Sequence, residues 1–419
     1  MRAGDLRPDD VVVTGRGVIS PIGNSLAETL PALREGRSGL SIDPDFVRLG
    51  FRCHVAGRIQ GLEVSQYLSD PETHSMSRTS LYSTIAAIQA VREAGLTPVD
   101  LERDESGVVL GCGLGSAETI IENGRKLVEQ SSPRRIGSHG VDRTMASTCA
   151  ANATVYFKTR GVGEALSSAC ATGLHNIGYA YRLIKHGYQD TVLCGAGDED
   201  GWASAHCFDA MRVLCADSNE CPERASRPLD RTRAGFVPAG GAGVVVLESA
   251  ARAMQRGAKP LARVAGYWSS TDGSGDMTAP SSEGQRRLVR MALRSGGLDA
   301  GCIDYVNLHA TSTPTGDVAE LVSLAEELGE GDYLVSASKS QIGHALGAAG
   351  GIELIFCLLM LEHGFVAPSL NIEELDPLLE PYRERIAAEV IERPLRYVMS
   401  NNFGFGNTNG SMILERVDA

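Results

Sequence analysis

The chain has 419 residues, of which 43% are hydrophobic and only 5% aromatic, and glycine is abundant at 48 residues. This length exceeds one ordinary domain, so two domains or one large duplicated α/β unit is expected. The formal net charge of −13 argues against general attraction to nucleic acid or anionic membranes, so neither is an expected partner.

The first ten residues lack the apolar stretch of a secretory signal. The chain carries 10 cysteines, and no two of them have C-x-x-C spacing. A zinc site or a redox motif is therefore not expected. These features predict a cytoplasmic protein with reduced thiols that requires no cofactor and no metal.

Short apolar runs alternate with helical patterns along the first part of the chain. Strand-like runs occupy residues 11–14, 107–110, 191–194 and 242–247, and helical patterns occupy residues 80–94 and 174–185. This alternation predicts βαβ units and a mostly parallel sheet. Residues 269–275 are expected to form a loop.

The pattern restarts near residue 261. Residues 261–267 resemble residues 10–16 as a first strand, and residues 305–309 resemble residues 107–111 as a later one. Two glycine-rich helix starts also correspond, one at Cys170 and one at His344. If the halves are duplicates, these helix N-termini lie near a pseudo-twofold axis, which would bring Cys170 and His344 together. We expect an N-terminal half over residues 1–260 and a C-terminal half over residues 261–419.

The most apolar segment, residues 351–370, contains Glu353, Glu362, His363 and Pro368. Charged residues and a proline suit a bilayer span poorly. The segment is therefore expected to be a buried helix, with no membrane insertion.

Cys170 follows a mostly apolar approach over residues 162–166 and precedes a helical pattern. Unpaired N–H groups and the partial positive charge at a helix start favour a thiolate and can hold a developing oxyanion. Free cysteine is nevertheless usually a small buried hydrophobe. The local pattern therefore makes Cys170 a candidate nucleophile, and no other cysteine has this setting.

Three further stretches carry chemistry. His309 ends an apolar strand before a Thr/Ser/Pro loop, where α/β proteins place their sites, although a lone histidine there is as often structural as catalytic. The others begin at Lys339 and at Asn401. The glycine patterns at 111–115 and 404–406 fit neither the dinucleotide fingerprint nor a phosphate-binding loop, so nucleotide binding is not expected. Residues 222–241, with several arginines, form either a loop near the site or an ordinary surface connection.

In this order and spacing, the stretches at Cys170, His309, Lys339 and Asn401 resemble the β-ketoacyl-acyl-carrier-protein synthases of the thiolase fold, nearly end to end. The segments Asp209-Ala-Met, Glu223-Arg-Ala-Ser-Arg and Leu361-Glu-His-Gly are most similar to the synthase I type. The resemblance implies an α/β fold in which duplicated βαβαβαββ halves form a five-layer αβαβα sandwich. It also implies an acyltransferase of type II fatty acid synthesis that condenses an acyl group with malonyl carrier protein.

The resemblance implies roles for individual residues. Cys170 would accept the acyl group, the backbone N–H groups of Cys170 and Phe405 would form an oxyanion hole, and His309 and His344 would donate N–H groups to the enolate. Lys339 and Glu353 would form an ion pair that supports His344 and the local network. The expected substrate contacts are Thr311 and Thr313 on the pantetheine arm, and Phe208, Phe236 and Leu114 near the acyl group, with core packing a competing role for both phenylalanines. A structural monovalent cation is implied near Asn307, Glu353, Ser400 and Asn401.

Several positions depart from the family pattern. Asn407 stands where glycine is usual, which puts the gating motion of its loop in doubt, and Ala310 and Asn402 also differ. Leu114 replaces a common glycine near the expected acyl pocket, so it would shorten or gate that pocket. The region 71–78 carries basic residues in relatives, but in this chain it has almost none.

The expected partners are acyl- and malonyl-loaded acyl carrier protein, docked on Arg125, Lys126, Arg134 and Arg135, and a second copy in a homodimer. A heterodimer with a ketosynthase-like partner stays open. Two alternative functions also stay open at this point: a ketosynthase of a dedicated aryl polyene or polyketide pathway, and a noncatalytic subunit that shapes a chain-length tunnel. Cys170, both histidines and Lys339 count against the second, because such subunits typically lack the active cysteine.

Overall fold

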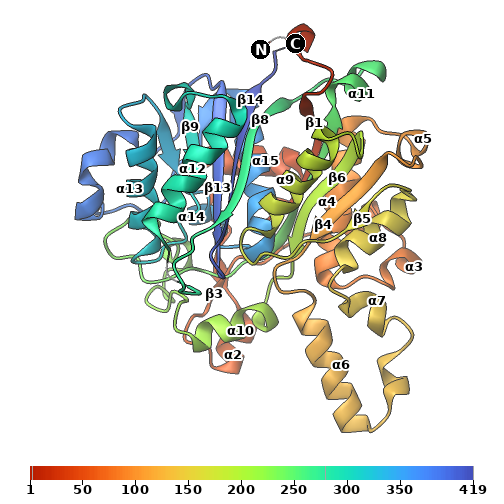
Figure 1. Ribbon diagram of the computed structural model, residues 1–419. Coiled ribbons are helices and arrows are strands. Elements are labelled where there is room, and N and C mark those ends of the chain that lie inside the picture. Colours follow the sequence, from red (N-terminus) through yellow and green to blue (C-terminus); the bar gives the residue numbers. More distant parts are fainter. Residues whose placement is uncertain (2, 279, 419) are drawn as a thin grey trace.

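The structure, a computed structural model, describes residues 1, 3–278 and 280–418. A ten-stranded sheet runs through the molecule in the order β10-β9-β13-β14-β8-β1-β7-β6-β4-β5 (Figure 1). In that order the strands are β10 (Leu334–Ser336), β9 (Tyr305–Asn307), β13 (Tyr397–Gly404), β14 (Thr408–Arg416), β8 (Ala262–Thr271), β1 (Val11–Ile19), β7 (Gly241–Ser249), β6 (Thr191–Asp198), β4 (Ser106–Gly111) and β5 (Gly163–Glu164). Two small sheets pair β2 (Ser41–Ile42) with β3 (Val55–Ala56) and β11 (Phe365–Val366) with β12 (Ile391–Glu392).

The strand order repeats on either side of the central β1–β8 pair. Within the N-terminal strands, β4 pairs parallel with β5 and β6, and β7 pairs antiparallel with β6 and β1. The C-terminal strands repeat this scheme, with β9 parallel to β10 and β13, and β14 antiparallel to β13 and β8. The predicted restart is confirmed by β8 and β9, whereas a domain boundary at residue 260 stays a prediction. The predicted mostly parallel sheet is wrong, because β7 and β14 run antiparallel to both neighbours, and an apolar run does not encode strand direction.

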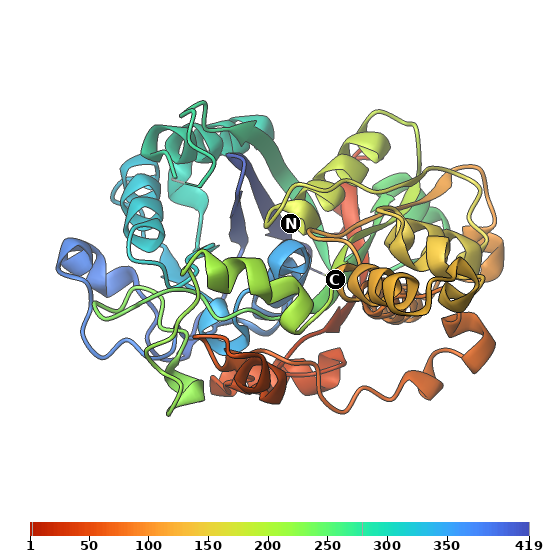
Figure 2. The same ribbon diagram turned by 90° about the horizontal axis from the view of Figure 1, so that it is seen from below.

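The helices form three layers around the strands (Figure 2). One outer layer packs on the N-terminal strands, a middle layer contacts both halves, and the other outer layer packs on the C-terminal strands. These layers contain, respectively, α4 (Arg78–Ala94) with α8 (Thr148–Phe157), α9 (Thr172–Lys185) with α15 (Ala349–His363), and α12 (Ser282–Gly296) with α13 (Gly316–Leu328). The predicted five-layer arrangement is confirmed. The remaining helices are α1 (Leu26–Glu35), α2 (Pro44–Leu49), α3 (Asp70–Thr73), α5 (Pro98–Leu101), α6 (Ala117–Gln130), α7 (Gly140–Thr144), α10 (Trp202–Ala210), α11 (Ala250–Gln255) and α14 (Lys339–Ile342).

The two middle helices meet backbone to backbone at their N-terminal turns. A Cβ atom on Gly173 would lie 2.6 Å from the backbone nitrogen of Gly351, and one on Gly350 would lie 2.7 Å from that of Leu174. Such distances exclude every side chain, so only glycine permits this approach. The contact fixes the helix starts of the two halves against each other, as the duplication predicted.

Helix α15 forms the centre of the core. The stretch Leu346–His363 is long and apolar enough to cross a membrane, but 89% of it is buried inside the structure. The helix ends where Gly364 adopts a left-handed conformation with φ 66°. The predicted buried helix is therefore confirmed up to His363, whereas residues 365–366 of the predicted segment form the strand β11. The expected loop at residues 269–275 begins later, because β8 continues to Thr271.

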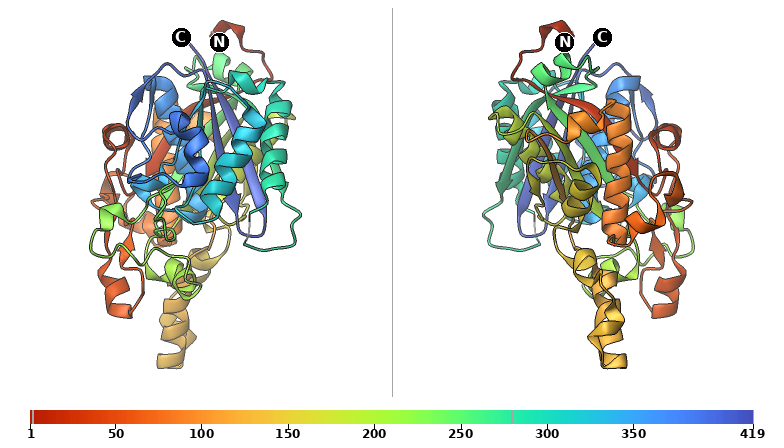
Figure 3. Two further views of the ribbon diagram at one scale, coloured as in Figure 1. Left: turned by 90° about the vertical axis from the view of Figure 1, so that its left-hand side faces the viewer. Right: turned by 90° about the vertical axis from the view of Figure 1, so that its right-hand side faces the viewer.

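Helix α6 projects from the body together with η3 (Pro133–Ile136) and α7 (Figures 1 and 3). No residue of α6 is buried, although the helix carries the exposed apolar side chains of Ile120, Ile121, Leu127 and Val128. The edge strand β5 is also exposed. Val141, Val155 and Leu166 are exposed as well, so the single chain leaves apolar side chains uncovered on α6 and on segments that follow it in the chain.

Candidate active site

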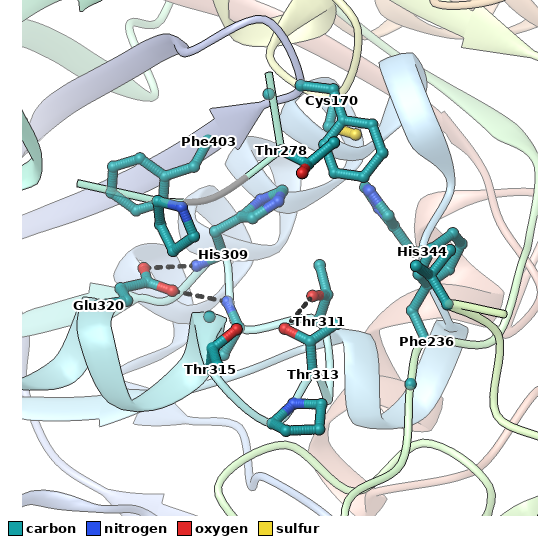
Figure 4. A pocket seen from close by; sticks show the side chains of 18 of the residues that line it. Cys170, Phe236, Thr278, His309, Thr311, Thr313, Thr315, Glu320, His344 and Phe403 are labelled. Atoms are coloured by element: carbon teal, nitrogen blue, oxygen red, sulfur yellow. Dashed lines mark hydrogen bonds between the residues drawn. The ribbon is translucent and has the colours of Figure 1, made fainter. Parts of the chain in front are cut away.

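A cavity of about 450 Å³ brings together residues from both halves (Figure 4). Cys170, His309 and His344 line it, together with the loop that carries Phe405. Cys170 precedes α9, His309 follows β9, and His344 lies between α14 and η6 (Leu346–Ala348). The predicted convergence of a thiol and two imidazoles is thus present.

Cys170 is half-buried, and the backbone N–H of Phe405 lies close enough to its thiol to lower the thiol pKa. Burial raises the pKa of the thiol to about 11, while the positive charge of Lys339 and the N–H groups of Phe405 and Cys170 lower it. The expectation that the helix start favours a thiolate is therefore wrong for the free enzyme, because desolvation outweighs the donors. The same N–H groups remain placed to receive a negative oxygen next to the sulfur.

His309 is fixed by hydrogen bonds on its backbone and on its ring. Glu320, on α13, accepts the N–H groups of His309 and Ala310 on its two carboxylate oxygens, each at 2.7 Å. The side-chain amide of Asn402 lies 3.3 Å from His309 Nδ1 and 2.8 Å from a carboxylate oxygen of Glu353. Because this amide donates to Nδ1, the ring hydrogen lies on Nε2, which can then donate to a ligand.

His344 presents its ring edge-on to two neighbours. Its centroid lies 5.3 Å from that of His309 at an interplanar angle of 88°, and 5.4 Å from that of Phe236 at 77°. Its backbone N–H donates to the Val237 carbonyl at 2.8 Å, which anchors the loop. Burial, assisted by the charge of Lys339, holds the pKa of both imidazoles well below 6.5. Both rings are therefore neutral and can each donate one N–H group.

Lys339 and Glu353 form a buried ion pair below the cavity, each with at most 1% of its side chain exposed. Burial raises the pKa of Glu353, while Lys339, Asn402 and Ser338 lower it. Among the described residues, the hydrogen bonds of this pair run to Ser338 and to Asn402, and Asn402 carries them on to His309. The expected support of His344 and the local network stays a prediction. Lys339 acts on His344 only through its charge.

Replacing Lys339 with methionine should lower the free energy of unfolding by about 3–5 kcal/mol, because it leaves the Glu353 carboxylate buried without its cation. The loss should be larger at pH 8 than at pH 5, since a carboxyl whose folded pKa is raised destabilises the fold as pH rises through that pKa. Urea denaturation at both pH values measures this. The Lys339→Met/Glu353→Gln double variant should recover most of the loss, and a double variant as unstable as the single one would contradict the ion-pair interpretation.

Alkylation of Cys170 by iodoacetamide should accelerate about tenfold per pH unit from pH 7 to pH 10, without a plateau, because its thiol pKa is about 11. Peptide mass spectrometry separates this signal from that of the exposed Cys207 and Cys221. A plateau below pH 8 would indicate a thiolate in the resting enzyme and would overturn this prediction.

Only some of the residues expected to contact the substrate line the cavity. Thr311, Thr313 and Phe236 line the cavity, and the two threonine hydroxyls lie 3.3 Å apart (Figure 4). Phe208 packs behind them, 5.3 Å from the ring of Phe236 and 6.3 Å from that of Phe405. Leu114 lies outside this cavity and is 45% exposed, near the projecting α6.

The expected docking and cation residues lie elsewhere. Arg125, Lys126, Arg134 and Arg135 are on the projecting α6–η3 segment, and no ion pair involves them among the described residues. Asn307 and Ser400 are paired neighbours on β9 and β13, and Ser338 links Asn307 to Glu353. The hydroxyl of Ser400 is buried beside the Cys357 thiol, and oxygen atoms of this kind suit a hard cation. Both polar atoms of the buried Asn401 side chain lack a hydrogen-bond partner among the described residues.

Sequence reasoning missed Asn402 and Glu320 as positioning residues and Asp198 as an anchor. Asp198 accepts the N–H groups of Gly113 at 2.9 Å and Gly347 at 2.7 Å, so it joins the two halves beside Cys170. Burial raises its pKa to about 7. These contacts join segments far apart in the chain, and the only local signal was a short run of acidic residues after an apolar strand.

Comparison with known proteins covers nearly the whole chain. Residues 8–253 match the family described as "Beta-ketoacyl synthase, N-terminal domain", and residues 261–373 match "Beta-ketoacyl synthase, C-terminal domain". The chain is 43% identical over 406 residues to a 3-oxoacyl-[acyl-carrier-protein] synthase 1 of Haemophilus influenzae, covering 97% of this chain and 98% of the relative.

Two solved structures share the fold. A beta-ketoacyl synthase from Burkholderia phymatum superposes with a TM-score of 0.91 at 34% identity, covering 98% of this chain and 100% of that one. A type II PKS ketosynthase bound to the hexaketide, in complex with its acyl-carrier protein, gives a TM-score of 0.89 at 27% identity, with the same coverage of 98% and 100%.

Proposed function

The chain belongs to the β-ketoacyl synthase family, and from this membership we propose that it is a 3-oxoacyl-acyl-carrier-protein synthase of the synthase I type. It condenses an acyl group with malonyl carrier protein in type II fatty acid synthesis, in the cytoplasm. The observation that carries the proposal is the cavity in which one thiol and two neutral imidazoles meet. The intact set argues against a noncatalytic chain-length subunit.

In the first half-reaction, Cys170 sulfur attacks the thioester carbonyl of acyl carrier protein. The carbonyl oxygen becomes negative and receives the N–H groups of Cys170 and Phe405. When the tetrahedral intermediate collapses, the carrier-protein thiol leaves with a proton and the acyl group stays on Cys170. The high pKa of the resting thiol makes this proton transfer part of the attack.

In the second half-reaction, the malonyl thioester loses CO₂ and leaves an enolate. Its oxygen requires hydrogen-bond donors, which the neutral rings of His309 and His344 supply. The carbanion attacks the Cys170 thioester, the oxyanion forms again at the same N–H groups, and collapse expels the Cys170 thiolate and the 3-oxoacyl product. The thiolate then takes a proton from solvent.

Residues around the thiol and the two imidazoles bind the substrate, hold the loops of the site in place or select the acyl group. Thr311 and Thr313 hydrogen-bond the pantetheine arm, and Phe236 and Phe208 bound the acyl end. Arg233 supports the threonine loop, because its guanidinium donates to the Thr313 and Pro314 carbonyls. A structural monovalent cation near Asn307, Glu353, Ser400 and Asn401 would offset the negative charge of the buried carboxylate.

The charge and exposure of surface residues indicate where partners bind. The unpaired cations Arg125, Lys126, Arg134 and Arg135 dock the acidic carrier protein. A homodimer covers the exposed apolar side chains on α6 and extends the sheet at the free edge of β5. We place the boundary between the two halves of each protomer at residue 260.

Replacing Leu114 with glycine should raise kcat/KM for long acyl chains relative to short ones by about tenfold or more, since Leu114 closes the acyl pocket completed in the dimer. Competition between acyl carrier proteins of different chain lengths measures the ratio. Leu49→Ala, which changes a leucine of nearly the same exposure on α2, is the control and should leave the ratio unchanged. Unaltered selectivity in Leu114→Gly would contradict the placement of Leu114 at the pocket.

The deciding experiment incubates the purified enzyme with malonyl carrier protein and a panel of acyl carrier proteins, and follows CO₂ release and product mass. Saturated acyl chains should be extended by two carbons to 3-oxoacyl products. Failure to condense any saturated chain would overturn the fatty acid assignment, and condensation of polyene or polyketide intermediates alone would assign a dedicated pathway.

A further inference from the structure

Two loops lie side by side at the mouth of the cavity. Residues 404–407, between β13 and β14, and residues 272–278, after β8, both contribute to its lining. They continue the β8–β14 ladder, whose last pair is Thr408 with Thr271. Beyond it, the Asp272 N–H donates to the Asn407 carbonyl at 3.1 Å, and the Gly406 N–H donates to the Met277 carbonyl at 2.8 Å.

Asn407 adds side-chain hydrogen bonds to this backbone pairing. Its amide nitrogen donates to the Asp276 carbonyl, and its amide oxygen accepts the Ser274 hydroxyl at 3.2 Å. It adopts a left-handed conformation with φ 60°, which asparagine tolerates better than most residues. The other residues of its loop, Gly404, Phe405 and Gly406, carry no polar side chain. Asn407 therefore supplies all side-chain hydrogen bonding from this loop to residues 272–278.

The same loop carries a group that acts on the nucleophile. Phe405, two residues before Asn407, lines the cavity together with Cys170, and its N–H lowers the pKa of the Cys170 thiol. The Phe405 ring is 36% exposed and packs on Phe208 across 6.3 Å. Glycine on both sides gives this segment more conformational freedom than other residues would, so the N–H direction depends on what ties the loop down.

We propose that Asn407 is a positioning residue of the condensing site, which ties the 404–407 loop to residues 272–278 and thereby aims the Phe405 N–H at Cys170. The inference rests on the proposed function and deepens it. With the tie intact, the oxyanion hole is formed before substrate arrives, and bulky groups reach Cys170 slowly. Without it, bulky groups enter faster, but the oxyanion is less well stabilised.

Asn407→Gly tests the proposal because glycine accepts the backbone conformation and removes only the amide. Loss of two hydrogen bonds predicts that kcat for condensation falls about tenfold at unchanged KM for carrier protein. The same loss predicts that Cys170 alkylation by a bulky maleimide accelerates about tenfold relative to iodoacetamide. Both effects together indicate positioning, since simple destabilisation would not favour the bulky reagent.

Two further variants sharpen the result. Asn371 has φ 67° and its amide bridges the Glu223 and Ser226 carbonyls away from the cavity, so Asn371→Gly is a matched control that should change neither quantity. Ser274→Ala should give a smaller change in the same direction, with no further effect in the Asn407→Gly background.

Wild-type values for both quantities in Asn407→Gly, or a full additional effect of Ser274→Ala in that background, would overturn the inference. Alkylation needs no carrier protein, so the alkylation ratio still tests the tie if the wild-type enzyme condenses no substrate. The experiments therefore distinguish a wrong proposed function from a wrong role of Asn407.

Discussion

Cys170→Ala should lower condensation by about 10⁴-fold or more, because no other group can accept the acyl chain. Decarboxylation of malonyl carrier protein should remain measurable in the same variant, since the donors that stabilise the enolate, His309 and His344, are untouched. The measurement follows CO₂ release and 3-oxoacyl product separately. Intact-protein mass should also show no acyl adduct.

Cys207→Ala is the control, since Cys207 is an exposed free thiol on α10, and it should behave as wild type. Wild-type condensation by Cys170→Ala would exclude the covalent mechanism. Loss of decarboxylation along with condensation would show that the thiol contributes to enolate formation, which the proposed division of roles does not allow.

His344→Ala should have the opposite effect to Cys170→Ala: it should impair decarboxylation and spare acyl transfer. Decarboxylation and condensation should each fall about 10²–10³-fold, the usual cost of losing one preorganised donor to a developing oxyanion. Transfer of an acyl group to Cys170 should change little, because that step uses the N–H groups of Cys170 and Phe405. A rapid-quench mass measurement of the acyl-enzyme tests the first step, and CO₂ release tests the second.

His186→Ala, at the exposed C-terminus of α9, controls for the loss of an imidazole. Equal losses in both half-reactions of His344→Ala would assign His344 to proton transfer from Cys170 as well as to enolate stabilisation. Unimpaired decarboxylation would remove His344 from the mechanism.

Residue patterns predicted the parts of the fold that depend on local sequence. The strands near residues 11, 107, 191 and 242 and the helices α4, α9 and α15 are present, because apolar periodicity and helix ends are encoded within each segment. The meeting of Cys170 and His344 was also predictable, since it follows from internal repetition. Strand direction was not, because β7 and β14 reverse the chain without any local sign of it.

The parts of the site that escaped prediction depend on contacts between distant segments. Asn402 bridges His309 and Glu353, and Glu320 holds the backbone after β9. Glu320 stands in no recognisable pattern, and the stretch that contains Asn402 does not show which residues it bridges. The raised pKa of Cys170 likewise results from burial by neighbours that a linear pattern does not display. Leu114 lies outside the cavity of the single chain, so the placement that the resemblance implied for it stays a prediction.

The glycine contact between α9 and α15 makes the centre of the site more rigid than its rim. Cys170 and the loop of His344 are tied through backbone atoms at Gly173, Gly350 and Gly351, where side-chain substitution has no room to act. The rim formed by residues 272–278 and 404–407 is joined partly through side chains. Single substitutions can therefore change the rim during selection for a new acyl substrate. The distance between the nucleophile and the enolate donors stays the same.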